Sequence, residues 1–151
     1  INNQGEVIAV IRDAANNSLW LGDIHGLHLI ASVVDPFRSF GSVAINNKGD
    51  YAFAALLDSG ISGIFTGTDP VLDKVIGIGD ALDGSTVTHI AFQGSGFNDR
   101  GQIAFYADLA NGRQGVYIAS VPEAGSLVML GAASAAALTL SARRRRNAIT
   151  R

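Results

Sequence analysis

Short apolar runs alternate with turns rich in Asn and Gly along residues 1–120. One turn occurs three times, as residues 1–5 (INNQG), 45–49 (INNKG) and 97–101 (FNDRG). Asn and Gly tolerate the positive φ of tight β-turns, so this segment predicts a turn between two strands. The copies start 44 (45 − 1) and 52 (97 − 45) residues apart. A period of roughly 40–50 residues with strand-like content is typical of β-propeller blades.

The apolar run after each turn alternates between two faces. In the second copy, Tyr51, Phe53, Ala55 and Leu57 lie opposite Asp50, Ala52, Ala54 and Leu56. In the third copy, Ile103, Phe105, Ala107 and Leu109 lie opposite Gln102, Ala104, Tyr106 and Asp108. The second face is small or apolar at its centre, which suits a sheet that neighbouring sheets cover on both sides.

The same pattern predicts four short strands in a complete repeat, and helical periodicity is absent before residue 126. The expected strands are 7–11, 19–21, 28–31, 42–44, 51–55, 64–66, 74–77, 89–92, 103–107 and 116–118. We therefore predict an all-β chain of tandem four-stranded, blade-like repeats that start near residues 1, 45 and 97.

The repeat resembles the tandem repeats of bacterial surface proteins that are predicted to form propellers. The second copy matches best, through Gly63-Ile64-Phe65 and the segment 75–80 (VIGIGD). The resemblance covers about residues 1–120 and implies a partial β-propeller. Two complete repeats and a partial third do not close a ring, which takes at least about four blades. We therefore expect the remaining blades in sequence that precedes Ile1, with an open β-solenoid or a sandwich of linked sheets as the alternative.

Charge divides the chain into two parts. Residues 1–120 hold twelve carboxylates and six Lys or Arg side chains, a balance of −6, whereas the last nine residues hold five arginines. The phosphates of nucleic acid bind Lys and Arg side chains, and residues 1–120 carry an excess of carboxylates. We therefore exclude nucleic acid as a partner. The chain has no cysteine, which excludes disulfides and thiolate metal sites.

Residues 127–142 form a run of sixteen uncharged, mostly apolar residues that ends at four arginines, Arg143, Arg144, Arg145 and Arg146. As a helix the run spans about 24 Å, slightly less than the roughly 30 Å of a bilayer core, and arginines at its end can extend the reach. We predict a transmembrane helix at 127–142, a membrane stop at the arginines and a cytoplasmic tail at 147–151. A buried Ala-rich helix and a permanent single-pass anchor are the alternatives.

The segment 121–146 resembles the PEP-CTERM sorting signal of exported bacterial proteins. The motif corresponds to Val121, Pro122, Glu123 and Ala124, with alanine where the family usually has its second proline. The resemblance implies that the tail tethers a precursor to the inner membrane until an exosortase-type membrane protease removes it. The mature protein is then at the cell surface or extracellular, often in bacteria that make exopolysaccharide.

Few polar residues are spaced for chemistry. The close pair His25 and His28 has too few neighbouring ligands for zinc, and we interpret these histidines as turn and strand-edge residues. The segment 80–85 (DALDGS) lacks the ligand spacing of a calcium loop, and we interpret it as a hairpin turn. Trp20, Phe65 and Tyr117 occupy equivalent positions and favour core packing over a carbohydrate-binding surface. We assign no catalytic, cofactor-binding or metal-ligating residue.

These patterns predict an exported, non-enzymatic cell-surface or extracellular-matrix protein whose repeat body has structural or binding roles. Two alternatives stay open. One is a lectin-like carbohydrate-binding module. The other is a propeller glycan hydrolase or lyase whose active site lies in the missing repeats.

Overall fold

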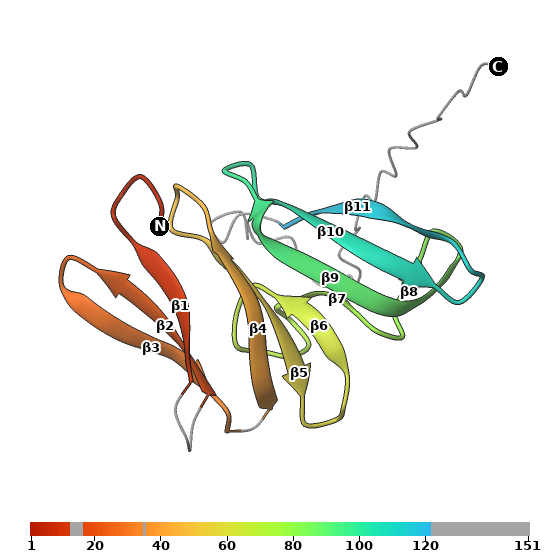
Figure 1. The fold of residues 1–151 in the computed structure, drawn as a ribbon, viewed down its shortest axis with the longest axis horizontal. Helices are drawn as coiled ribbons and strands as arrows, with labels where there is room; N and C mark the ends of the chain where they lie inside the picture. The colour runs from red at the N-terminus through yellow and green to blue at the C-terminus, as the bar shows by residue number, and fades with distance from the viewer. Residues whose placement is uncertain (13–16, 35, 122–151) are drawn as a thin grey trace, which may run out of the picture.

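The fold is all-β in the part of the chain that the computed structural model describes, residues 1–12, 17–34 and 36–121. The strands form three antiparallel sheets that follow one another in chain order (Figure 1). The all-β class predicted from the alternation of apolar and polar residues is therefore confirmed.

Each sheet is a meander in which strands adjacent in sequence pair with each other. The first sheet contains β1 (Val7–Arg12), β2 (Asn17–Asp23) and β3 (Gly26–Ser32). The second contains β4 (Phe37–Ile45), β5 (Tyr51–Leu57), β6 (Ser62–Phe65) and β7 (Lys74–Gly77). The third contains β8 (Ala81–Leu82), β9 (Ser85–Phe97), β10 (Gln102–Leu109) and β11 (Gln114–Ser120).

The sheets are out of phase with the sequence repeats by one strand. β4 ends at Ile45, the repeated turn follows, and β5 returns beside β4 with Tyr51 opposite Ile45. β9 and β10 are joined in the same way around the third turn. A tight turn connects neighbouring antiparallel strands. The turn therefore lies inside a sheet, and the last strand of one sequence repeat becomes the first strand of the next sheet.

Two apolar layers hold the three sheets together. The layer between the first and second sheets contains Ile8, Leu19, Ala31, Phe37, Phe40, Phe53, Ala55, Leu57 and Phe65. The layer between the second and third sheets includes Ala44, Ala52, Ile64, Ile76, Phe92, Ile103, Phe105, Ala107, Tyr117 and Ala119. The second sheet contributes to both layers, so it is covered on both faces, as the small apolar second face of residues 50–56 predicts.

The strand β5 shows how sequence alternation serves the two layers. Phe53 packs on the side of the first sheet, with ring centroids 5.6 Å from Phe37, 5.7 Å from Phe40 and 5.9 Å from Phe65. Such ring pairs contribute about 0.5–1.5 kcal/mol beyond the burial of their surface. The buried Ala52 lies on the other side, where a small side chain lets the third sheet approach closely.

The predicted helix 127–142, the arginines 143–146 and the predicted cytoplasmic tail 147–151 all lie outside the described residues. Within residues 1–12, 17–34 and 36–121, no helix has the length and apolar character needed to cross a membrane.

Candidate functional site

The repeated turn is built around one asparagine in each copy, Asn2, Asn46 or Asn98. Its Oδ1 accepts hydrogen bonds of 2.9–3.0 Å from the backbone N–H groups two and four residues later. Its Nδ2 donates to a side-chain oxygen four residues later, at 2.6–3.0 Å. The glycine that closes each turn has φ of 82°, 85° and 68° in the three copies, a left-handed conformation that favours glycine.

The same asparagines join neighbouring turns into a ladder. Asn2 Nδ2 donates to the backbone carbonyl of Asn46 at 3.0 Å, and Asn46 Nδ2 donates to the carbonyl of Asn98 at 3.3 Å. Asn2 and Asn46 are buried, so these bonds replace water contacts at the ends of the sheets. Every donor lies on the earlier turn and every acceptor on the later one, which gives the ladder a direction.

The next residue of each turn adds a second set of bonds. The backbone N–H of Asn3 donates to Asn47 Oδ1 at 2.9 Å, and the N–H of Asn47 donates to Asp99 Oδ1 at 2.8 Å. Asn47 Nδ2 also donates to Asp99 Oδ2 at 2.9 Å. These bonds hold the pKa of the Asp99 carboxyl below its ordinary value, because they stabilise its charged form. We call Asn2, Asn3, Asn46, Asn47, Asn98 and Asp99 the asparagine ladder.

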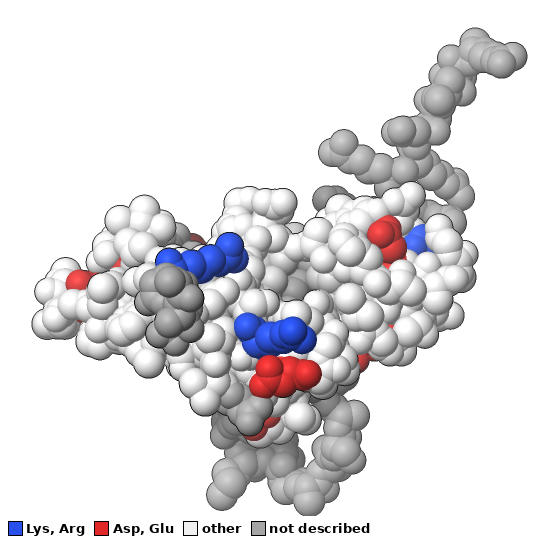
Figure 2. Space-filling view, turned by 60° about the horizontal axis from the view of Figure 1, so that its bottom comes forward, with Lys and Arg blue, Asp and Glu red and all other residues white. Residues whose placement is uncertain are grey.

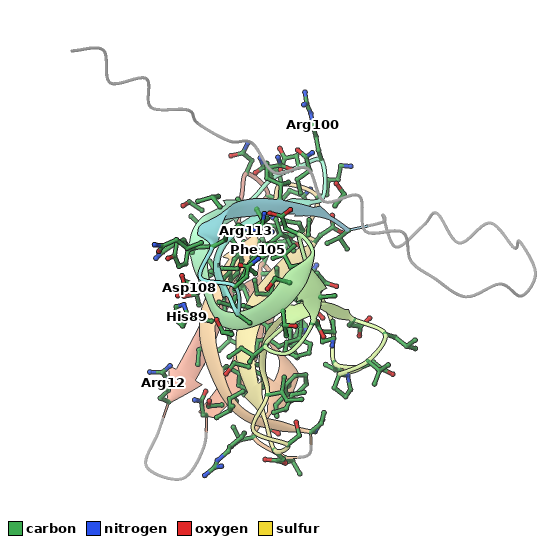
Figure 3. All side chains as sticks on the ribbon, turned by 90° about the vertical axis from the view of Figure 1, so that its right-hand side faces the viewer. Arg12, His89, Arg100, Phe105, Asp108 and Arg113 are labelled. Carbon is green, nitrogen blue, oxygen red and sulfur yellow. The ribbon has the colours of Figure 1, made fainter. Side chains whose placement is uncertain are left out.

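A cluster of four polar side chains, His89, Tyr106, Asp108 and Gln114, lies on the outer face of the third sheet. His89 Nδ1 is 3.5 Å from Asp108 Oδ2, and the Tyr106 hydroxyl contacts Gln114 and donates to Asp108 Oδ1 at 2.5 Å. The bond to Asp108 raises the pKa of Tyr106, because it favours the protonated phenol. Figure 3 shows His89 and Asp108 side by side. Imidazole, carboxylate, phenol and amide groups in this arrangement are suited to hydrogen bonding with a polar ligand.

This outer cluster was not predicted from the sequence. His89 and Asp108 are neighbours because they pair across β9 and β10, and Gln114 pairs with Asp108 across β10 and β11. Because the register between β9 and β10 is irregular, no fixed residue spacing in the sequence predicts this pairing.

An open cavity of about 360 Å³ lies where β1, β4, β5, β6 and β9 come together. Its lining includes Arg12, Ser39, Phe40, Ser62, Ile90 and Phe92. Arg12 is held at the cavity by a 2.9 Å hydrogen bond from Nη2 to the carbonyl of Phe40. On the face that Figure 2 shows, uncharged residues predominate and the basic ones lie in small, separate patches. The cavity therefore combines apolar walls with hydroxyl groups and one guanidinium, within the size range of small-ligand sites.

The histidine pair predicted as turn residues lies in and beside the turn between β2 and β3. The backbone N–H of His25 donates to Asp23 Oδ1 at 2.7 Å, and His28 Nε2 is 3.2 Å from the same oxygen. The bond from His25 is the main cause that lowers the pKa of Asp23. Across the part of the chain that the structure describes, no three His, Cys, Asp or Glu side chains are grouped to hold a metal ion.

The segment 80–85 forms the hairpin between β8 and β9, as its turn residues predict. Asp83 and Gly84 both have positive φ, 50° and 73°, which defines a tight turn suited to the twist of paired strands. Its carboxylates engage different cations, since Asp80 Oδ1 is 2.8 Å from Lys74 Nζ and Asp83 Oδ2 is 3.1 Å from Arg113 Nη2.

The three equivalent aromatic residues take part in packing. Phe65 and Tyr117 are buried and stack on the rings of Phe53 and Phe105, which confirms the core role predicted for them. Trp20 is half-buried on the outer side of the first sheet and donates through Nε1 to Ser18 Oγ at 2.8 Å.

The predicted sorting motif begins where the third sheet ends. The backbone N–H of Val121 donates to the carbonyl of Gly101 at 2.8 Å, and its side chain packs on the apolar layer of the third sheet. Pro122, Glu123, Ala124 and the four arginines of the predicted membrane stop lie outside the described residues.

One family model matches this chain. Residues 91–128 are similar to a family of unknown function (DUF7453). The match covers part of β9, all of β10 and β11, and the start of the predicted sorting signal. No curated protein and no solved structure matches the chain.

Proposed function

We propose that this chain is an exported, non-enzymatic component of the bacterial cell surface or extracellular matrix, with sheets that are blades of a β-propeller. The asparagine ladder is the observation that carries the proposal. It joins successive repeats through the same turn, and the apolar layers join them through the same sheet faces. Repetition of one unit through nearest-neighbour contacts is how propellers and other repeat proteins build extended binding surfaces.

The contacts between sheets support a radial arrangement of blades. β9 lies against β4, and β4 lies against β1. The sheets thus meet chiefly through the strands nearest the ladder turns, as the inner strands of blades do around an axis. Figure 1 shows the three sheets fanning out from this region.

The C-terminal segment 121–146 supports the proposed location of the protein. The order of a Val-Pro-Glu motif, an apolar run and an arginine stop supports sorting by an exosortase-type membrane protease. In this proposal the inner membrane is a transient anchor for the precursor. The released body then acts at the cell surface, where exopolysaccharide is its expected neighbour.

The test follows one epitope in the body and a second at the C-terminus, in a bacterium with and without its exosortase-type protease. We expect the surface fraction to carry the body epitope alone, and the protease-deficient strain to keep both epitopes in the inner membrane. A Pro122→Ala/Glu123→Ala variant should behave like the protease-deficient strain, whereas Arg38→Ala, in the body, should be processed normally. A C-terminal epitope that persists on the surface protein would contradict removal of the tail.

A carbohydrate-binding module is the second candidate, and the cavity beside Arg12 favours it. A guanidinium and two serine hydroxyls offer hydrogen bonds to a sugar ring, and Ile90 adds an apolar side chain to the wall. Saturation-transfer NMR with methyl glycosides and with host exopolysaccharide tests this function. Signals that Arg12→Ala removes and Arg38→Ala retains would support it, since Arg38 lies on β4 but does not line the cavity. No saturation transfer to any of these probes would reject it.

A further inference from the structure

The cavity beside Arg12 lies within the stack of sheets and has a single charged side chain in its lining. Most of the lining belongs to the second sheet, which is covered on both faces, and Ile90 and Phe92 come from β9. The lining contains no Asp or Glu, and within the described residues no carboxylate lies within ion-pair distance of Arg12. The cavity therefore offers a positive charge that no described neighbour neutralises.

The guanidinium of Arg12 is held in place but only partly used. It is exposed, and a guanidinium has five N–H donors. Across the part of the chain that the structure describes, its side chain makes one hydrogen bond, from Nη2 to the carbonyl of Phe40. The other donors remain for a ligand, and their planar arrangement matches the two oxygens of a carboxylate.

Two serine hydroxyls are available in the same wall. Ser39 on β4 and Ser62 on β6 are half-buried, and neither hydroxyl forms a hydrogen bond with a described residue. Each hydroxyl can donate one hydrogen bond and accept two. The cavity thus presents unused groups of the kind that bond to the hydroxyls of a sugar.

The aromatic residues of the lining do not offer a stacking surface. Phe40 and Phe92 are 1% and 4% exposed, so their rings are used in the apolar layers between sheets. A neutral sugar would therefore depend on hydroxyl hydrogen bonds, which replace equivalent bonds to water. A carboxylate on the sugar would add a charge-assisted bond to Arg12, which is roughly twice as strong as a neutral one.

Small residues on β4 and β5 leave room for the ligand. Gly41 and Ala54 both line the cavity, and a Cβ on Gly41 would lie 3.4 Å from the Cβ of Ala54. A larger side chain at Gly41 would therefore occupy space between these strands. The volume of about 360 Å³ is near the lower end for small-ligand sites, which suits one sugar ring.

We propose that this cavity binds an acidic sugar, a uronic acid residue whose carboxylate pairs with Arg12 and whose hydroxyls bond to Ser39 and Ser62. The inference rests on the carbohydrate-binding function proposed above and names the class of sugar. Since Arg12 is exposed, salt screens the pairing, and the preference for the acidic sugar depends on ionic strength.

Two probes that differ in one group test the proposal. Methyl glucuronide carries a carboxylate where methyl glucoside carries a hydroxymethyl group. In NMR titrations of the full chain in a mild detergent, the glucuronide should bind with a Kd about tenfold lower at low salt. This ratio should shrink as sodium chloride is added, because screening weakens the contact with Arg12 and leaves neutral hydrogen bonds unchanged.

Three variants locate the binding site. Arg12→Gln keeps neutral donors and removes the charge, so it should raise the Kd of the glucuronide to that of the glucoside. Arg38→Gln is the matched control on β4, outside the lining, and should keep the wild-type ratio. Gly41→Val should weaken both probes, because it fills the cavity. A glucuronide Kd that none of the three variants changes would overturn the proposal.

The wild-type titrations separate this inference from the function on which it rests. Equal Kd values for glucuronide and glucoside would overturn the preference for an acidic sugar and retain carbohydrate binding. Binding of neither probe would reject both. Sodium acetate is the control for the carboxylate alone, and acetate that binds as tightly as the glucuronide would show that Arg12 holds any small anion, which also contradicts a sugar site.

Discussion

Asn46 uses both ends of one side-chain amide, and its surroundings explain why asparagine stands at this place. Its Oδ1 satisfies two backbone N–H groups of its own turn, while its Nδ2 reaches Asp50 and the carbonyl of Asn98 in the next sheet. Aspartate lacks the donor that this ladder step needs, and serine has a single oxygen in place of the amide. The residue therefore specifies the turn and the neighbour at the same time.

Replacing Asn46 by alanine should lower the free energy of unfolding by roughly 2–4 kcal/mol, because it removes a buried side chain that bonds two backbone N–H groups of its own turn and the carbonyl of Asn98. Asn98→Ala removes the same turn bonds at an exposed position and should cost only about 1 kcal/mol. Urea unfolding of the two variants and the wild type measures both losses. Equal losses would mean that the step from Asn46 to Asn98 adds nothing to stability.

Asp99 should make part of the stability depend on acid pH. Its pKa is lowered in the folded chain, so its stabilising effect is complete above the ordinary carboxyl value of about 4 and is lost as the pH falls through the folded value. Asp99→Asn keeps the shape and does not titrate. The difference in thermal midpoint between wild type and Asp99→Asn should shrink from pH 7 to pH 2. A constant difference would show that the charge of Asp99 makes no contribution.

At the scale of elements, β5 and its neighbours form the packing centre. Phe53 is fully buried and contacts the rings of Phe37, Phe40 and Phe65. Phe53→Ala should therefore destabilise the chain by about 3–5 kcal/mol, through lost burial and the cavity left behind. Val116→Ala is the control and should change stability by less than about 1 kcal/mol, because its side chain is 64% exposed. If chemical unfolding shows similar losses of stability for Phe53→Ala and Val116→Ala, the assignment of this layer as the core is contradicted.

The individual strands were predictable from sequence, but their grouping into sheets was not. The alternation of side chains between two faces predicts strands at 51–55 and 103–107, because the face to which a side chain points depends only on its position along the strand. Sheet membership depends on which strands pair, and the turn that marks the repeat sits between two paired strands, β4 and β5. The two-residue strand β8 was missed, since Ala81 and Leu82 are too few to show a period.

The candidate sites show the same limit. The repeated asparagines are visible in the sequence as turn formers, yet the ladder requires contacts between residues 44 and 52 positions apart. The pairing of His89 with Asp108 depends on an irregular register that no local pattern records. Local chemistry was therefore predictable, and contacts that depend on how sheets stack were not.

For the whole molecule, the order of the sheets should set the order of local stability. The second sheet is covered on both faces, whereas the first sheet leaves Val7, Leu27 and Leu29 exposed. Opening free energies follow burial and hydrogen bonding, so backbone amides of β5 and β6 should exchange most slowly and those of β1 and β3 faster. Hydrogen exchange followed by mass spectrometry measures this order. Protection of β1 and β3 equal to that of β5 and β6 would contradict the gradient of burial from which this prediction is drawn.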